Sequence, residues 1–220
     1  MSAEPASFER PVRKQQQRSV ITQQKLLDAA IDAFSENGFK GTSTRDIADR
    51  AGVHHPLITY HFKNKDQLWR AATDRIFREF HVSLLKAMAD IPELDPKARG
   101  EAFIRTYVKY SFSHPALHKI ILQESSHTSD RLDWLVENHL QPLYEMVKGQ
   151  MIKLQELGVS PPGHPALLYN MIRVSAGGLL ALGLEVRATS DFDFNDEERR
   201  NELADMIVRV FLPGDLPPHP

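Results

Sequence analysis

The sequence predicts an all-α protein, in which a small three-helix head at the N-terminus precedes a larger helical domain. Two observations support this fold class. Apolar residues recur every three or four positions over most of the chain, which is the spacing of amphipathic helices. Glycines and prolines separate these periodic segments, and both residue types favour helix ends and turns.

Length and composition indicate an ordinary globular protein. The chain has 220 residues, enough to bury a core, and 41% of them are hydrophobic and 25% charged. It has no cysteine, which excludes disulfides and thiolate metal sites and fits a reducing compartment. No apolar run follows the first basic residues, so we expect no secretory signal and a cytoplasmic protein.

The charge is unevenly distributed along the chain. Lys and Arg outnumber Asp and Glu through Lys65, whereas acidic residues are in excess after it. Such a distribution suits a protein that presents one end to a polyanion. Residues 1–18 are expected to form a disordered basic arm that follows phosphates or enters a minor groove. A solvated tail that contacts nothing is the equal alternative.

The sequence pattern of residues 19–65 predicts three helices. The first begins near Thr22 and ends at Gly38, which supplies a left-handed stop. The second begins after a cap at Ser43 or Thr44 and ends before the turn at Gly52. The third spans about residues 55–62, with a proline in its first turn. Its buried side is expected to consist of Ile58 and Phe62.

The other side of this third helix has an unusual composition for a solvated surface. It carries His, Thr and Tyr, with lysines following, rather than the Glu, Lys and Gln of an ordinary exposed face. Two short helices joined at a glycine commonly place the second in the major groove of DNA. The pattern therefore predicts a face that contacts bases and phosphates.

The span from Leu26 to Trp69 resembles the N-terminal domain of TetR/AcrR-family transcriptional repressors. The resemblance rests on the segments LLDAAIDAFSENGFKGTSTRDIADRAGV and HFKNKDQLW. It implies a helix-turn-helix domain at 19–65 that binds a double-stranded DNA operator, and a homodimer. It also implies that residues 66–220 form an effector-binding and dimerisation domain whose small-molecule ligand releases the DNA.

The sequence departs from the family pattern within the third helix. An aromatic residue is common in the family where this chain has Thr59, and Tyr60 is expected to take its phosphate contact. His55 and Leu57 are the predicted base-edge contacts, the leucine being suited to a thymine methyl group. The full predicted DNA-binding set is Ser43, Thr44, Arg45, His54, His55, Pro56, Leu57, Thr59, Tyr60, His61 and Lys65.

The C-terminal domain is expected to be helical throughout. A long helix over about 65–89 is followed by helices at about 97–113, 115–126, 130–157, 164–188 and 196–211, with residues 213–220 as a loose tail. Pro142 should kink the third of these five. The apolar run 174–184 is too short to span a membrane, and we expect it to pack against a second subunit. The predicted dimer interface comprises Gly177, Leu180, Leu184, Leu203, Ile207 and Val210.

Aromatic and polar positions on these helices predict an effector site for an aromatic or amphipathic small molecule. Each of them is also a candidate for the hydrophobic core. The predicted set is Phe103, Tyr107, Tyr110, Trp134, Tyr144, Tyr169 and Arg173.

Other chemistries have weaker support. The spacing from Asp191 imitates a calcium loop but has Asp196 where the loop needs glycine, and Asn195 with Glu198 fits a helix-capping box better. His114 and His118 are four residues apart, as in zinc sites, and Glu124 with His127 matches half of a di-iron motif. Neither set is completed elsewhere, so we expect no metal and no cofactor. No catalytic motif is present, although a helical enzyme or metal-binding protein with a vestigial head is the rival class.

Overall fold

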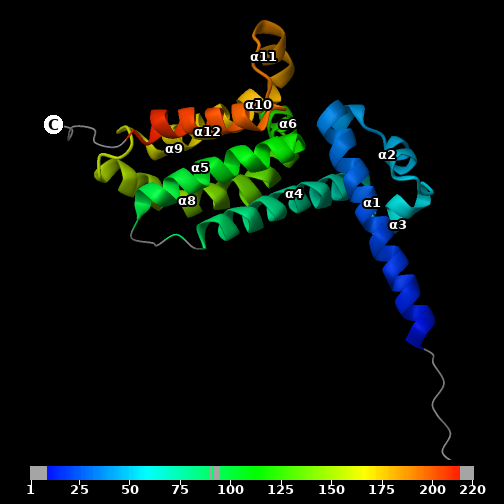
Figure 1. Ribbon diagram of the computed structural model, residues 1–220. Coiled ribbons are helices and arrows are strands. Elements are labelled where there is room, and N and C mark those ends of the chain that lie inside the picture. Colours follow the sequence, from blue (N-terminus) through cyan, green and yellow to red (C-terminus); the bar gives the residue numbers. More distant parts are fainter. Residues whose placement is uncertain (1–8, 90, 92–94, 214–220) are drawn as a thin grey trace, which may run out of the picture. The chain divides into compact units, whose positions relative to one another are not determined.

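The computed structural model describes residues 9–89, 91 and 95–213, and every regular element among them is a helix (Figure 1). This confirms the all-α fold class. The chain divides into two compact units, Met1–Asp74 and Arg75–Pro220. The division falls within helix α4 (Lys65–Met88), later in that helix than the boundary expected after Lys65.

Helix α1 (Glu9–Gly41) is longer than the sequence predicted. Residues 9–18 were expected to belong to a disordered arm, but they are helical. Pro11 stands in the first turn, where no intrahelical N–H bond is needed, and the Lys, Gln and Arg residues after it favour helix. Residues 1–8 of the predicted arm lie outside the described residues.

The stop predicted for the first helix is present as a kink at Gly38, inside α1. Gly38 has a φ of 69°, a backbone conformation that glycine adopts without steric cost. The hydroxyl of Thr42 donates to the carbonyls of Ala33 and Gly38, at 2.9 Å and 2.8 Å. These bonds satisfy carbonyls at the helix end and fix the direction in which the chain leaves it.

Helices α2 (Thr44–Ala51) and α3 (Pro56–Phe62) confirm the two short helices of the predicted head. Ser43 is the cap, because its hydroxyl accepts a hydrogen bond from the Asp46 backbone N–H at 3.0 Å. Gly52 takes the left-handed conformation that ends α2. The side chains that hold these helices on α1 and the start of α4 are fully or almost fully buried: Leu26, Ala30, Phe34, Ile47, Ala48, Ile58, Phe62, Leu68, Trp69 and Ala72.

The second unit contains the remainder of α4 and the helices that follow it. Three of the helices that follow have a proline in the first turn after a non-helical residue, a position that tolerates its missing N–H. In Figure 1, α5 (Pro96–Ser113), α8 (Gln141–Glu156) and α12 (Glu197–Phe211) lie alongside one another. The unit also contains α6 (Pro115–Ser125), α7 (Asp130–Leu135) and α9 (Pro165–Arg173).

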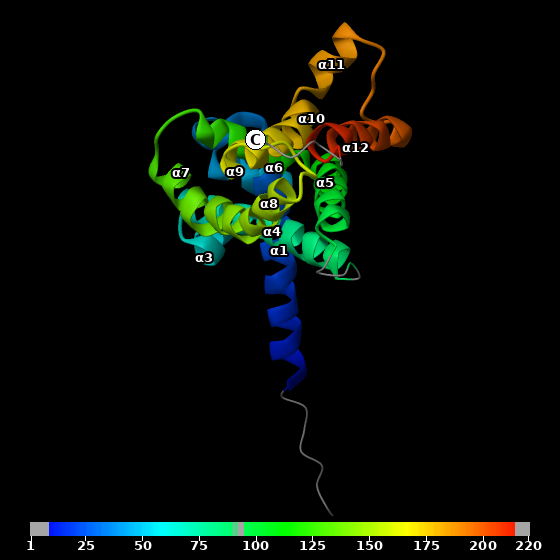
Figure 2. The same ribbon diagram turned by 90° about the vertical axis from the view of Figure 1, so that its left-hand side faces the viewer.

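Two predicted long helices are interrupted by π-helical turns. The helix expected over 130–157 contains η1 (Val136–Leu140), which ends two residues before Pro142; that proline has no N–H to continue the regular hydrogen-bond ladder. The helix expected over 164–188 contains η2 (Val174–Gly178) and α10 (Leu179–Ala181), then breaks at Leu182. Helix α11 (Gly183–Thr189) follows at a bend of 71° and stands away from the bundle of its unit in both views (Figures 1 and 2).

Candidate nucleic-acid interface and internal cavity

Helix α3 is held by one face and leaves the other open. Ile58 and Phe62 are 1% and 5% exposed, so they anchor the helix in the core of the first unit. Tyr60 is 75% exposed, and its ring meets that of His61 edge-on at 4.9 Å. Of the predicted DNA-binding residues, the exposed ones are Ser43, Arg45, His54, His55, Pro56, Thr59 and Tyr60, and the partly exposed ones are Thr44, Leu57, His61 and Lys65.

His55 is oriented by a residue of the neighbouring helix. Its Nε2 lies 3.0 Å from the hydroxyl of Thr44, the first residue of α2. The other ring nitrogen, Nδ1, can then face a ligand. Thr44 therefore positions the predicted base-reading side chain, a role that its place in the sequence does not reveal. Partial burial lowers the pKa of His61, which favours its neutral form.

Lys65 has an internal role that the sequence did not predict. Its ammonium donates to the carbonyls of Phe39 and Thr42, at 2.8 Å and 2.9 Å, and lies 4.3 Å from the centroid of the Phe39 ring. The expected phosphate contact would compete with these bonds. Lys63, which was not in the predicted set, is exposed at the end of α3, as Arg45 is on α2. These two cations are better placed to meet a phosphate.

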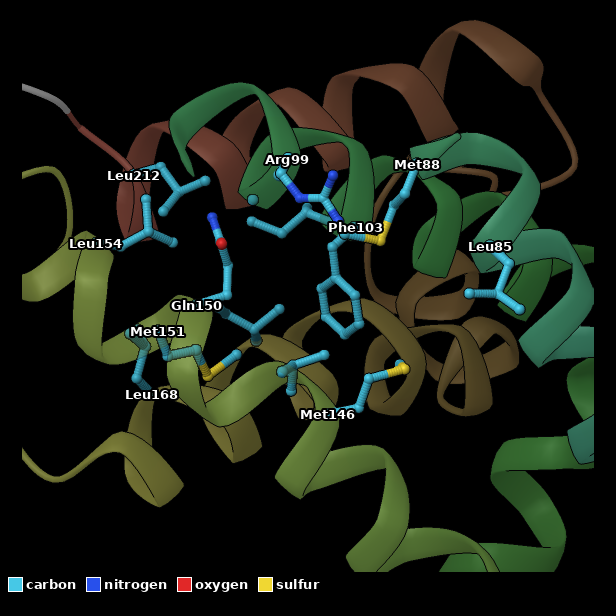
Figure 3. Close-up of a pocket in the computed structure, with 14 residues that line it drawn as sticks. Leu85, Met88, Arg99, Phe103, Met146, Gln150, Met151, Leu154, Leu168 and Leu212 are labelled. Carbon is cyan, nitrogen blue, oxygen red and sulfur yellow. The ribbon is translucent and has the colours of Figure 1, made fainter. Parts of the chain in front are cut away.

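The second unit contains a partly open cavity of about 300 Å³, a size typical of small ligand sites (Figure 3). Helices α4, α5, α8 and α9 supply most of its wall, which is largely aliphatic. The polar side chains in the wall are Arg99 and Gln150. The lining residues are Leu85, Met88, Arg99, Gly100, Phe103, Ile104, Met146, Val147, Gln150, Met151, Leu154, Leu168, Ile172 and Leu212.

The predicted effector residues do not form one site. Phe103 lines the cavity, whereas Tyr107 and Tyr110 are buried beside it in the core, where the Tyr110 hydroxyl donates to the Ile76 carbonyl at 2.8 Å. The helical spacing of these three residues indicated that they share one face of α5, but it did not indicate whether that face borders a cavity or the core. Trp134 does not line the cavity. Its ring packs edge-on against the His139 ring, with the ring centroids 5.2 Å apart.

The other three predicted effector residues share a separate, shallower hollow of about 240 Å³. Tyr144, Tyr169 and Arg173 lie there on α8 and α9. The two tyrosine rings are 5.4 Å apart, and burial raises the pKa of Tyr169 to about 12. The residues that line the larger cavity were missed because Met, Leu and Gln at helical spacing also describe an ordinary core.

The candidate metal ligands of the sequence serve other purposes. His114 contacts the Tyr110 carbonyl at 3.1 Å, whereas Nε2 of His118 lies 2.6 Å from the hydroxyl of Ser111. Burial and the charge of Arg173 lower the pKa of His118 to about 4. Buried Glu124 is paired with Arg131 at 3.2 Å. Within the described ranges, no three His, Asp or Glu side chains gather as a metal site.

The acidic loop before α12 begins that helix differently from the prediction. Asp196 is the cap, since its carboxylate accepts a hydrogen bond from the Glu198 backbone N–H at 2.9 Å. Asn195 instead donates its backbone and side-chain N–H groups to the Asp193 carboxylate. The predicted capping box of Asn195 and Glu198 is therefore wrong by one position.

The exposed apolar side chains of α9, η2 and α12 are called the apolar stripe. Its side chains are half to two-thirds exposed and recur at three- and four-residue spacing: Leu167, Met171, Val174, Met206 and Val210. Three residues predicted for a dimer interface, Gly177, Leu203 and Ile207, are instead buried within this chain. Apolar residues occur on more than one face of these helices, so their spacing in the sequence did not distinguish the buried face from the exposed one. Leu184 is 86% exposed, and Leu180 is partly exposed.

No single helix of the described ranges has both the length and the apolar composition to cross a membrane. The bent pair formed by Pro165–Ala181 and Gly183–Thr189 meets the two criteria only when its members are taken together.

Comparisons with known proteins agree with this arrangement. The family described as "Bacterial regulatory proteins, tetR family" matches residues 26–72, which comprise most of the head. RutR of Escherichia coli (strain K12), an HTH-type transcriptional regulator, is 26% identical over 201 residues, covering 91% of this chain and 93% of RutR.

Two solved structures share the fold. The structure of AibR in complex with isovaleryl coenzyme A and operator DNA has a TM-score of 0.71 at 16% identity, covering 87% of this chain and 98% of AibR. HlyIIR, a hemolysin II transcriptional regulator, has a TM-score of 0.68 at 18% identity, covering 88% and 98%. The helix-turn-helix head, residues 26–72, therefore belongs to the tetR family of bacterial regulatory proteins, and the chain as a whole shares the fold of the regulators AibR and HlyIIR.

Proposed function

We propose that this protein is a ligand-responsive transcriptional repressor, which binds a palindromic operator as a homodimer and is released by a small-molecule effector. The observation that carries the DNA-binding part is the geometry of α3. Two buried side chains, Ile58 and Phe62, fix the helix, while its exposed face presents His55, Thr59 and Tyr60. Such a helix can enter a major groove without disturbing the core that supports it.

The contacts on that face divide into two kinds. His55 and Leu57 stand near the start of the helix and are proposed to contact base edges. Arg45, Tyr60 and Lys63 are proposed to contact phosphates, which position the protein on DNA without reading its sequence. Ser43 caps α2, and Lys65 holds the head together. A repressor acts where its operator lies, so we place this protein in the cytoplasm.

The apolar stripe on α9, η2 and α12 supports the homodimer. Leu167, Met171 and Val174 follow one another along one helical face, and Met206 and Val210 continue the stripe on α12. Exposed apolar side chains of this kind favour association, because burying them removes apolar surface from water. A symmetric dimer would present two α3 helices to two half-sites, which is why the operator is proposed to be palindromic.

The cavity of the second unit supports effector control. A ligand bound there releases DNA only if it binds the DNA-incompatible state more tightly than the DNA-bound state. AibR is a relative of the same fold that was crystallised with both a small molecule and operator DNA. For the present chain, we propose that the effector occupies the cavity of Figure 3.

A mobility-shift titration against fragments from the upstream region of the protein's own gene tests this function. We expect one fragment to be retained preferentially, with affinity falling steeply as salt rises because counterions are released from the DNA. Tyr60→Ala should weaken retention, whereas Lys109→Ala, which removes an exposed cation from α5, should not. Failure to prefer any fragment at any salt concentration would sink the proposal and favour the rival class of enzyme or metal-binding protein.

A further inference from the structure

The cavity of Figure 3 has one charged side chain. Among its fourteen lining residues, Arg99 carries the only formal charge, and the amide of Gln150 is the other polar group. The figure shows both head groups on the same side of the cavity, with Met146 and Met151 on the opposite side. A bound molecule would therefore contact polar groups on one side of the cavity and apolar side chains elsewhere.

Both polar groups are held in place by backbone carbonyls. Nη1 of Arg99 donates to the Ile91 carbonyl at 3.1 Å, and Nε2 of Gln150 donates to the Pro96 carbonyl at 2.6 Å. Each group has further N–H donors. No carboxylate within the described ranges forms an ion pair with Arg99. A positive fork that is fixed in position and lacks a described counterion suits a ligand carboxylate.

The remaining wall suits a flexible hydrocarbon chain. Ten of the fourteen lining side chains are aliphatic or Met, and Phe103 is the only aromatic one. Met88, Met146 and Met151 are unbranched and can adapt to a chain that bends. The volume of about 300 Å³ corresponds to roughly ten non-hydrogen atoms, at about 30 Å³ for each.

We propose that the cavity binds a medium-chain monocarboxylate of about eight carbons, whose carboxylate is held by Arg99 and Gln150. The proposal rests on the effector role of the cavity stated above and gives that effector a chemical class. The hydrocarbon chain would lie against the Met and Leu side chains and lose its contact with water. A cationic head on the same chain would face Arg99 and be excluded.

Isothermal titration calorimetry on the full-length protein, without DNA, tests the proposal. The probes are octanoate, 1-octanol and octylammonium, all below their aggregation concentrations, so that only the head group changes. We expect octanoate to bind, octanol to bind at least tenfold more weakly, and octylammonium to bind least. Equal affinity for octanoate and octanol would overturn the proposal, as would no binding of octanoate.

Variants then assign the head group to Arg99. Arg99→Gln should weaken octanoate roughly 10- to 100-fold, the range of a hydrogen bond to a charged group, and leave octanol unchanged. The matched control is Arg105→Gln on the same helix, whose arginine is paired with Asp205 at 2.7 Å and does not line the cavity. Unchanged octanoate affinity in Arg99→Gln would overturn the proposal, and unchanged octanol affinity shows that the variant still has its cavity.

These measurements are independent of the DNA assay. Octanoate binding without release of a retained DNA fragment supports the ligand class and contradicts effector release. Retention of a fragment by a protein that does not bind octanoate supports DNA binding and overturns the ligand class.

Discussion

The hydroxyl of Thr44 lies 3.0 Å from Nε2 of His55, which joins the first residue of α2 to the residue that precedes α3. The bond connects two positions eleven residues apart on the two helices of the helix-turn-helix motif. It sets the direction of the imidazole and thereby the nitrogen that can face DNA. The two residues are expected to act as a pair in operator recognition.

We expect His55→Ala to change sequence preference, with a loss of about 1–3 kcal/mol of discrimination at one base pair of each half-site. Thr44→Val should weaken the same preference, because the ring loses its partner but remains present. A binding-site selection measures both, with Lys109→Ala as the control. An unchanged consensus for His55→Ala would contradict the base-reading role.

Lys65→Gln should destabilise the head by about 1–3 kcal/mol, because two hydrogen bonds from a charged donor are lost. The measurement is the free energy of unfolding from a urea titration. In contrast, the slope of log affinity against log salt should be that of the unmodified protein. Arg45→Ala is the comparison, since losing one phosphate contact lowers that slope by about 0.9. If Lys65→Gln lowered this salt slope, the result would support the phosphate contact that the sequence predicted for Lys65.

Gly177→Ala should cost about 1–3 kcal/mol of stability, because a Cβ at this position would overlap the imidazole ring of His118. Gly149→Ala is the matched control within α8: nothing lies within 4 Å of the added methyl group, so stability should rise by up to about 1 kcal/mol. Thermal unfolding monitored by circular dichroism compares the two. Equal effects of the two substitutions would show that close packing against His118 is not the cause.

Stability should fall as the pH drops from about 6.5 towards 4. Burial and the charge of Arg173 lower the pKa of His118 from 6.5 to about 4, so protons bind the unfolded chain first and favour unfolding. This effect amounts to about 3 kcal/mol of the free energy of unfolding, which is fully present above pH 6.5 and is lost as the pH falls to about 4. Urea titrations at several pH values measure it, and His118→Gln should flatten the profile in that window. A profile unchanged by His118→Gln would contradict this assignment.

If the proposed homodimer forms through the apolar stripe, Met171→Glu and Val210→Glu should convert it to a monomer, because each places a charge on the stripe. Sedimentation velocity at micromolar protein gives the oligomeric state directly. Val82→Glu replaces an exposed valine of α4 and should leave the dimer intact. If Leu184→Glu dissociates the dimer whereas Met171→Glu does not, the interface lies on α11 instead.

The head could be predicted closely because its signals are local. Gly38 and Gly52 occupy left-handed turns, Pro56 begins α3, and the apolar period places Ile58 and Phe62 inside. Each of these signals acts within a few residues of its own position and does not depend on the rest of the fold. The helical class of the second unit followed from the same periodicity, whereas its π-helical turns did not.

Which residues line the cavity was determined by the tertiary structure. Phe103 and Tyr107 lie one turn apart on the same face of α5, yet only Phe103 borders the cavity. Likewise, the sequence marks Arg99 only as a cation near a helix start. Its place in the cavity wall depends on how α5 packs against α8. Sequence period alone determined which faces of this chain are apolar, but only packing decided which of them meet the core, the cavity or the surface, since hydrophobic burial has no intrinsic direction.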